Sequence, residues 1–528
     1  MNIVFIMRHS GFVRIFESTL RLLCERGHRV HVAFLSSERQ WQVDAPDIAQ
    51  QLAAEFPRFS RGMAPERADA WASLGRELRG TLDYLRYLAP RYRNAPKLRA
   101  RAARDVPEAV LRKTERGPYA SGPGRAALAA WLRLMERSIP VSREIDAFLV
   151  EHNPDLLLVS PLVEPGSPQR EYLRAARARG IRTVLCVASW DNLTNKGLIH
   201  GPVDLVTVWN THMRQEAVEL HGIAQDRVAV TGAQQFDHWF SWQPATSRTT
   251  FCARVGLVSA DPYLLYLGSS KFVAPDEAAF VRQWLRQLRD SPSAALRRVG
   301  VVIRPHPQNE EQWRRFDAPG CANWTIYPRS GAVPLDAASK SDYFDSIYHS
   351  AAVVGVNTTA EIESAIVGRR VYTLLAPEFR DTQEGTLHFH YLREAGGGLV
   401  HEAHDFPEHL AQLDEALRAG VEQDAQCRRF VEVFVRPHGI EVEAASKLVD
   451  AIESASARPF ASSHVSPRVM RLLQPALARR AARAERDARN RAEAKAAERH
   501  VKSQLAKEDK KRQRKAQKRR QAEAGEKV

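Results

Sequence analysis

Two stretches of this chain each place polar residues at the end of a short apolar strand. The first, residues 299–307, reads VGVVIRPHP. Its β-branched run suits a buried parallel strand, and Arg304 and His306 follow in a loop fixed by two prolines. In open α/β sheets, ligands bind at the carboxyl ends of the strands. We therefore expect this guanidinium and this imidazole at a ligand-binding edge.

The second stretch repeats the pattern further along the chain. Residues 351–356 form an apolar strand, and residues 360–367 read as a helix. The polar turn between them consists of Asn357, Thr358 and Thr359. The start of a helix offers free backbone N–H groups and positive dipole charge to an anion. The turn is a second candidate for holding phosphate.

Each stretch also has an interpretation that needs no ligand. Thr358 and Glu361 have the spacing of a capping box, and Pro305 and Pro307 are ordinary loop residues. Together, in this order and about one βαβ unit apart, the two stretches favour a phosphate site.

Residues 304–307 (RPHP), followed by residues 357–359 (NTT), resemble the "HP" and paired Ser/Thr motifs of bacterial capsule and surface-polysaccharide transferases with the GT-B fold. Similar pairs occur in sialyl- and Kdo-type transferases and in CDP-glycerol glycerophosphotransferases. The resemblance covers most of residues 1–450. It implies an α/β fold of two Rossmann-like domains, here with a helical insertion in the first and a basic helical or disordered C-terminal tail.

Alternating strand and helix patterns suggest where the domains lie. We expect an N-terminal acceptor domain at 1–245 with a helical insertion at about 58–140, a C-terminal nucleotide-donor domain at 246–455, a linker at 456–478 and a basic tail at 479–528. Apart from alanine, the apolar residues of the tail are Val501, Leu505 and Val528. The tail is therefore expected to be solvated.

Residues 71–93 of the insertion have two interpretations. Leucines recur at three- and four-residue steps, which predicts an amphipathic helix, and three tyrosines are interleaved with arginines: Tyr84, Tyr87 and Tyr92. The helix either packs its leucines and solvates its arginines, or presents a face to anionic lipid or to a lipid-linked acceptor.

The net charge of +15 is concentrated at one end of the chain. Residues 479–528 hold 19 Lys and Arg against 8 Asp and Glu, so they supply +11 and leave +4 for the other 478 residues. A nucleic-acid partner is therefore not expected for the protein as a whole. The tail suits an anionic membrane surface, with RNA contact or simple solubilisation as alternatives.

The cysteines and the chain start indicate a cytoplasmic protein. The five cysteines are far apart without CxxC spacing, so neither a disulfide framework nor a zinc site is expected. Met1 leads into an apolar strand without a basic region or cleavage site, and no apolar run is long enough to cross a bilayer.

Transfer from a nucleotide sugar requires neutralisation of the phosphate leaving group and deprotonation of the acceptor hydroxyl. The chain has no DxD motif for a metal, so we expect metal-independent neutralisation and no cofactor, with the nucleotide sugar as a substrate. The candidate donor-binding residues are Gly268, Ser269, Ser270, Arg304, His306, Asn357, Thr358 and Thr359. The resemblance adds Glu363 as a ligand of the ribose hydroxyls, although it also fits an exposed helix glutamate.

The base is expected from the first domain. His9 follows the first strand, where some GT-B families place a catalytic histidine, and Asp191 lies in a loop flanked by Trp and Asn. Either side chain could deprotonate a hydroxyl, and either also fits an ordinary turn residue.

These observations favour a cytoplasmic transferase that moves a sugar from a nucleotide-sugar donor to a surface polysaccharide or lipid-linked acceptor of the bacterial cell envelope. Peripheral contact with the inner face of the membrane is an open alternative to a purely cytoplasmic location. Three alternatives remain open at this point. They are a CDP-glycerol-type polyol phosphotransferase, a UDP-sugar 2-epimerase, and a non-catalytic GT-B scaffold whose tail binds membrane or RNA.

Overall fold

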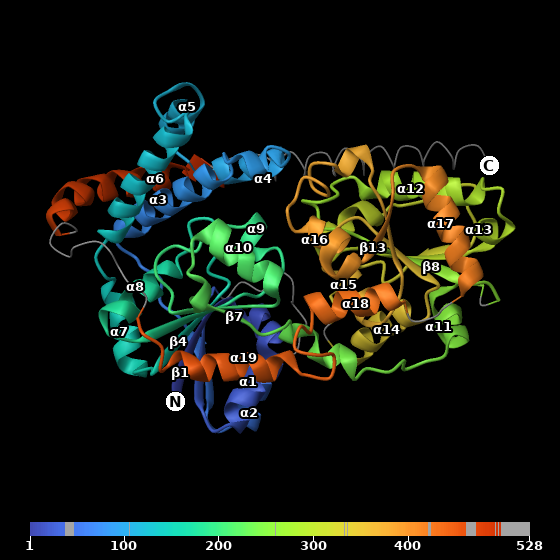
Figure 1. The fold of residues 1–528 in the computed structure, drawn as a ribbon, viewed down its shortest axis with the longest axis horizontal. Coiled ribbons are helices and arrows are strands. Elements are labelled where there is room, and N and C mark those ends of the chain that lie inside the picture. Colours follow the sequence, from blue (N-terminus) through green and yellow to red (C-terminus); the bar gives the residue numbers. More distant parts are fainter. Residues whose placement is uncertain are drawn as a thin grey trace, which may run out of the picture.

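The computed structural model describes residues 1–36, 47–104, 106–258, 260–331, 333–334, 336–420, 424–460, 471–491, 493–494 and 496–497. Residues 461–470 of the predicted linker and most of the predicted tail lie outside the described residues. The described chain forms two α/β units side by side, each built on one parallel sheet (Figure 1).

The first unit contains a seven-stranded sheet with the order β3-β2-β1-β4-β5-β6-β7, and every described pairing is parallel. The strands are β1 (Asn2–His9), β2 (Arg29–Ser36), β3 (Phe59–Met63), β4 (Leu156–Ser160), β5 (Arg182–Cys186), β6 (Leu205–Val208) and β7 (Val228–Val230). The main helices around it are α1 (Val13–Glu25), α2 (Ile48–Glu55), α7 (Arg143–His152), α8 (Arg170–Ala178), α9 (Asn192–Asn195) and α10 (Thr211–His221). The strand order reverses between β1 and β4, which is the point where such sheets bind ligands.

The second unit contains a six-stranded sheet with the order β10-β9-β8-β11-β12-β13, also parallel. Its strands are β8 (Tyr263–Leu267), β9 (Gly300–Arg304), β10 (Trp324–Ile326), β11 (Ala352–Gly355), β12 (Val371–Leu374) and β13 (Val400–Ala403). Its helices include α11 (Arg248–Val255), α12 (Glu277–Arg289), α13 (Ala294–Arg298), α14 (Ala337–Tyr348), α15 (Thr359–Ile366), α16 (Phe389–Glu394), α17 (Phe406–Ala419) and α18 (Ala425–Phe434). The predicted α/β fold with two Rossmann-like domains of the GT-B type is confirmed.

The chain crosses between the two units twice. It leaves the first through the 3₁₀ segment η4 (Gln234–Phe240) and returns through α19 (Ala444–Ala455), which packs on α1 within the core of the first unit. The Asp237 carboxylate of η4 accepts the backbone N–H groups of Ala444 (3.0 Å) and Ala445 (2.8 Å), and the guanidinium of Arg436 (2.8 Å). One buried carboxylate thus caps α19 and holds the segment that precedes it.

The helical insertion starts later than expected, because residues 59–63 form β3 and pair with β2. β3 is an edge strand with mostly exposed side chains, so it lacks the apolar alternation by which a strand is recognised. The insertion consists of α3 (Trp71–Arg86), η2 (Pro90–Tyr92), α4 (Pro96–Ala103), α5 (Glu108–Arg116) and α6 (Gly122–Arg137). Buried ion pairs attach it to α8, where Glu171 meets Arg79 of α3 (2.8 Å) and Arg174 meets Glu136 of α6 (2.7 Å).

The leucine stripe and the tyrosines of the insertion are buried together. Leu74, Leu78, Leu82 and Leu85 form one core cluster with Tyr84, Tyr87 and Tyr92. The prediction that residues 71–93 pack their leucines is therefore confirmed. The tyrosines are buried with the leucines and are not available to a lipid surface.

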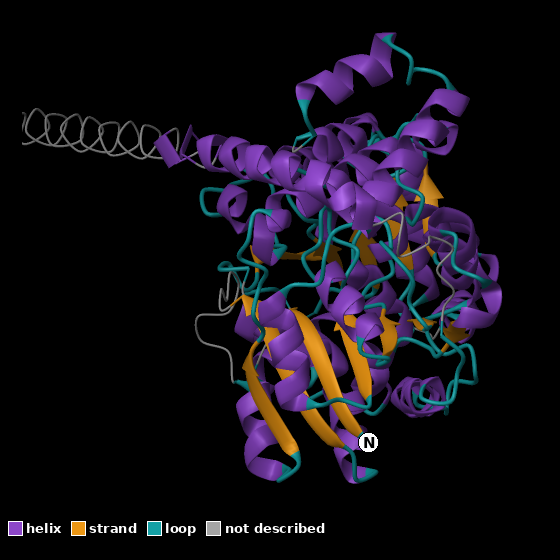
Figure 2. Cartoon of the chain, turned by 90° about the vertical axis from the view of Figure 1, so that its left-hand side faces the viewer, coloured by secondary structure: helices purple, strands orange, loops and turns teal. Residues whose placement is uncertain are grey.

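Residues 471–491 form a helix that lies beside α3 and α6 (Figure 1; Figure 2 gives a second view). Leu477, Ala481 and Ala484 are buried in the core cluster of the insertion, and Arg480 pairs with Glu77 (2.9 Å). The expectation of a linker is wrong for residues 471–478, which belong to this helix. The helical alternative for the tail is confirmed over residues 479–491, although one side of the helix is packed and not solvated. Alanines spaced by three and four residues form a narrow packing face that a search for large apolar residues overlooks.

None of the helices in the described part of the chain combines the length and apolarity needed to cross a bilayer.

Two leucines of this C-terminal helix provide a matched test of its docking. Leu477 is 6% exposed and Leu472 is 79% exposed. Leu477→Ala should weaken the attachment of the helix by about 2–5 kcal/mol, because it leaves a cavity in the cluster. Leu472→Ala should change little. Hydrogen exchange of the amides in residues 471–491 measures both effects, and equal exchange in the two variants would contradict the docking.

Candidate functional site

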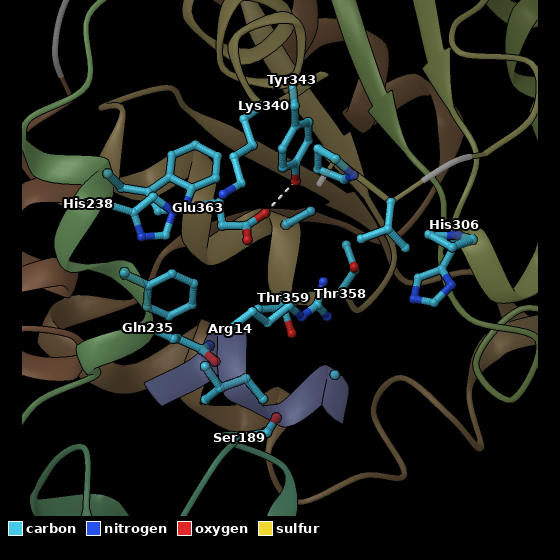
Figure 3. A pocket seen from close by; sticks show the side chains of 18 of the residues that line it. Arg14, Ser189, Gln235, His238, His306, Lys340, Tyr343, Thr358, Thr359 and Glu363 are labelled. Atoms are coloured by element: carbon cyan, nitrogen blue, oxygen red, sulfur yellow. Dashed lines mark hydrogen bonds between the residues drawn. The ribbon is translucent and has the colours of Figure 1, made fainter. Parts of the chain in front are cut away.

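A cavity of about 950 Å³ lies between the two units, at the carboxyl ends of both sheets. Its walls come from the loop after β1 and from α1, from the crossing segment at residues 234–242, and from the loops and helix starts that follow β8, β9 and β11. Figure 3 shows Arg14 and Ser189 on one side and Lys340, Tyr343 and Glu363 on the other. The topology thus brings chemically active side chains of both units together.

Arg304, the last residue of β9, is a buried cation in the cavity wall. It is 8% exposed, its Nη1 donates to Ser346 Oγ at 3.4 Å, and its guanidinium lies over the Tyr343 ring at 4.8 Å. Burial lowers the pKa of Arg304 to about 10, with tyrosines and Glu363 as the opposing groups. Since it has no ion-pair partner among the described residues, an anionic ligand would relieve the cost of burying its charge.

His9 and His306 are anchored in the same way at the ends of β1 and β9. His9 Nδ1 accepts the N–H of Gly11 (3.2 Å), and His306 Nδ1 accepts the N–H of Gln308 (3.0 Å). Burial lowers the pKa of each to about 4, and for His9 the cations Arg8 and Arg14 contribute. Because Nδ1 accepts in both cases, the single proton of each neutral ring lies on Nε2. Both histidines are therefore hydrogen-bond donors through Nε2.

Two of the three residues in the polar turn after β11 line the cavity, and the third is used in hydrogen bonds that hold the loop. Thr358 and Thr359 line the cavity, whereas Asn357 is buried and donates to the Thr382 carbonyl oxygen (3.0 Å). Thr358 forms the capping box with Glu361. The Thr359 hydroxyl oxygen accepts the indole N–H of Trp190 from the first unit at 3.1 Å, which leaves its O–H free to donate.

The loop after β8 contributes shape rather than donors. Gly268 lines the cavity, but its N–H bonds the Arg304 carbonyl oxygen (2.8 Å). The N–H of Ser269 bonds the buried carboxyl group of Glu277 (3.0 and 2.9 Å). Neither Ser269 nor Ser270 is among the lining residues. Burial raises the pKa of Glu277 to about 8.

Asp191 lies behind the cavity wall rather than in it. Its carboxylate accepts from Ser189 Oγ (2.8 Å) and pairs with Lys196 (3.4 Å). Although burial opposes ionisation, Lys196 and His388 lower the pKa of Asp191 to about 2. It therefore supports the Ser189 loop as a permanently charged carboxylate.

Glu363, on the first turns of α15, faces the cavity and accepts a hydrogen bond from the Tyr343 hydroxyl. Burial raises its pKa to about 7, against the lowering effects of Tyr343, Arg14 and Arg304. It is therefore the cavity carboxylate whose charge changes near neutral pH.

The cavity side chains that the sequence interpretation missed include Arg14 on α1, and Lys340 and Tyr343 on α14. Arg14 has no ion-pair or hydrogen-bond partner among the described residues; burial lowers its pKa, while Glu363 opposes this. The available signal was a cation in the first turn of a helix, which the helix dipole disfavours unless an anion is nearby.

One end of the cavity is aromatic. Trp239 lies 4.9 Å from Trp242 and 5.6 Å from Tyr343, measured between ring centroids. Because Tyr343 also lies under Arg304, the aromatic end is continuous with the charged end. A ligand with a flat ring beside phosphates would match this arrangement.

In the described ranges, no group of three or more His, Cys, Asp or Glu side chains is arranged to hold a metal ion.

Neither the known protein-family models nor the curated proteins include a match to this chain. Solved structures with a similar overall fold include Staphylococcus aureus MnaA with UDP (11% identity, 88% of this chain, 100% of that chain, TM-score 0.48). Another is a UDP-GlcNAc 2-epimerase of Methanocaldococcus jannaschii (10% identity, 86% of this chain, 100% of that chain, TM-score 0.46). A third is a glycosyltransferase of Rickettsia africae (9% identity, 86% of this chain, 98% of that chain, TM-score 0.47). At these identities the likeness concerns the fold alone.

Gly268 provides a test of how the anion-facing loop is placed. A Cβ at this position would lie 2.9 Å from His306 N and 3.0 Å from the Arg304 carbonyl oxygen. Gly268→Ala should therefore displace both residues and weaken the binding of a phosphate-containing ligand at this edge by about tenfold, equivalent to about 1.4 kcal/mol. Gly80→Ala, where nothing lies within 4 Å of the added Cβ, is the control. Equal affinity in both variants, measured by calorimetry, would show that the loop does not shape the site.

Proposed function

We propose that the protein is a metal-independent glycosyltransferase that moves a sugar from a nucleotide-sugar donor to a surface polysaccharide or lipid-linked acceptor. The observation that carries the proposal is the buried guanidinium of Arg304, without an ion-pair partner among the described residues, in a cavity shared by two Rossmann-like units.

The second unit supplies the donor-binding groups. Arg304, the Nε2–H of His306 and the hydroxyl of Thr359 face the cavity and can donate to phosphate oxygens. When the bond between the sugar and phosphate breaks, the electron pair and the negative charge move to the phosphate. Preorganised donors in a site of low polarity stabilise that charge with little reorganisation. The aromatic end formed by Trp239 and Trp242 offers a surface for the nucleotide base.

The first unit supplies the acceptor side. His9, Arg14 and Ser189 line the opposite wall, and Trp190 ties this wall to Thr359. An acceptor hydroxyl bound there would face the donor sugar across the cavity. This division follows from the two-domain topology, since each sheet directs its own loops toward the same space.

The arrangement favours transfer over 2-epimerisation. Epimerisation needs carboxylates of the first domain to move a proton on the sugar. The described first-domain lining contains a single carboxylate, Glu17, and it bonds Arg21 (3.2 Å). A polyol phosphotransferase would use the same anion-binding groups, so the donor that binds separates it from a glycosyltransferase.

A panel of UDP-, GDP-, CMP- and CDP-linked compounds tests the proposal by thermal shift, because a ligand that binds only the folded state raises its stability. For a nucleotide sugar that binds, Arg304→Ala should lower the affinity by about ten- to hundredfold, as expected for the loss of a charge-assisted hydrogen bond. Arg314→Ala removes an exposed arginine paired with Glu310 and serves as the control. Binding of CDP-glycerol alone would support the phosphotransferase, and binding of no nucleotide would contradict both.

A lipid-linked acceptor would bring the protein to an anionic membrane. We place this contact on the exposed arginines of the insertion and of the helix at 471–491, since the tyrosines of residues 71–93 are buried. Trp131 (49% exposed) and Leu472 (79% exposed) add apolar side chains suited to a lipid interface. The RNA alternative concerns residues 479–528, which contain no aromatic residue to stack on bases, and this argues against RNA.

Co-sedimentation with anionic vesicles tests this contact. Replacing Arg104, Arg112, Lys113 and Arg116 by Gln should reduce pelleting at low salt, at about 1 kcal/mol per residue held near the surface. The control removes the same charge from the second unit, at the exposed residues Arg298, Arg314, Arg418 and Arg428. Equal loss in both variants would indicate attraction by net charge, and unchanged pelleting in both would exclude the insertion as the contact.

A further inference from the structure

We propose that Glu363, on α15 of the second unit, is the group that removes the proton from the acceptor hydroxyl, and that Tyr343 positions its carboxylate. This inference rests on the proposed glycosyl transfer and replaces the first-domain residues His9 and Asp191 as the base.

The geometry of Glu363 suits this role. Tyr343 donates its hydroxyl proton to Oε2, and no donor to Oε1 is found in the described part of the chain. Figure 3 shows the carboxylate between the two walls, with Oε2 joined to Tyr343 and the other oxygen turned into the cavity. One oxygen is thus held in place while the other remains free to accept a proton.

Apart from His238, the other bases in the cavity are occupied or misplaced. His9 and His306 each use Nδ1 to accept a backbone N–H, so Nε2 already carries the proton and cannot accept another without charging the ring. Asp191 lies outside the lining, and Glu17 bonds Arg21. His238 is the remaining candidate; it is exposed on the crossing segment, with its ring 4.6 Å from Trp242.

The step balances in atoms and charge. The acceptor oxygen forms a bond to the anomeric carbon of the donor sugar as the bond from that carbon to the phosphate oxygen breaks. The acceptor proton moves to Oε1 of Glu363. The electron pair leaves with the phosphate, where Arg304 and the Nε2–H of His306 stabilise the charge.

The groups around Glu363 and its burial bring the pKa of its carboxyl group close to neutral pH. The charged and titratable groups facing it are Tyr343 and Lys340 of α14, Arg14 of α1, Arg304 of β9 and His238 of η4. Burial raises its pKa to about 7, whereas Tyr343, Arg14 and Arg304 lower it. A base acts when deprotonated, so the rate should rise with pH through about 7 and then level off.

The test uses the nucleotide sugar that binds wild-type protein, with water in place of the unidentified acceptor, and follows nucleotide release. Glu363→Gln should lower release by about 10²–10⁴-fold, leave nucleotide affinity nearly unchanged and abolish the rise near pH 7. Azide needs no deprotonation, so it should restore release in this variant. Tyr343→Phe should move the rise to higher pH, because a group that lowers the pKa of Glu363 is lost.

Two further variants make the result decisive. Glu432→Gln alters an exposed helix carboxylate far in sequence from the cavity lining and should behave like wild type. His238→Gln overturns the proposal if it, rather than Glu363→Gln, abolishes the rise. A loss of nucleotide affinity in Glu363→Gln that matches the loss of release would make Glu363 a donor ligand instead. Donor binding without release in either water or azide would contradict the transfer reaction itself.

Discussion

One buried carboxylate determines how the two units meet. Asp237 holds Arg436, which also lies over the Phe240 ring at 3.6 Å, and it caps the start of α19. Because α19 packs on α1, this contact sets the position of the helix that carries Arg14 relative to the unit that carries Arg304. Removing one partner of a buried charge pair leaves the other without compensation, which makes such a contact hard to replace. The cavity therefore depends on a residue that does not line it.

The fold could be predicted where burial leaves a clear pattern. The strands β8 and β9 are buried throughout, and continuous apolar runs indicate parallel strands of this kind. The edge strand β3 exposes most of its side chains, and the helix at 471–491 packs through alanines, so neither leaves a strong signal. Both elements form because a neighbouring surface is present, β2 for β3 and the insertion for the helix, and the local sequence pattern does not show that surface.

The site could be predicted as far as strand order determines it. His9, Gly268, Arg304, His306, Thr358, Thr359 and Glu363 line one cavity because the carboxyl ends of the strands share an edge within each sheet and the two edges face each other. The direction of individual groups depends on distant partners. The Glu277 carboxyl group accepts the N–H of Ser269, and the Thr382 carbonyl oxygen accepts the side-chain amide of Asn357. Lys196 forms an ion pair with Asp191. Arg14 and Tyr343 enter from helices, where no motif marks them.

The neutral imidazoles have a consequence for the whole fold. Burial lowers the pKa of His9, His31, His306, His388 and His409 to about 4. In the unfolded chain these rings titrate near 6.5. The contribution of these neutral rings to stability is therefore complete above about pH 6.5 and is lost progressively as the pH falls toward 4, since the unfolded chain then binds more protons. Mild acid acts on this protein through its histidines before most carboxylates begin to titrate.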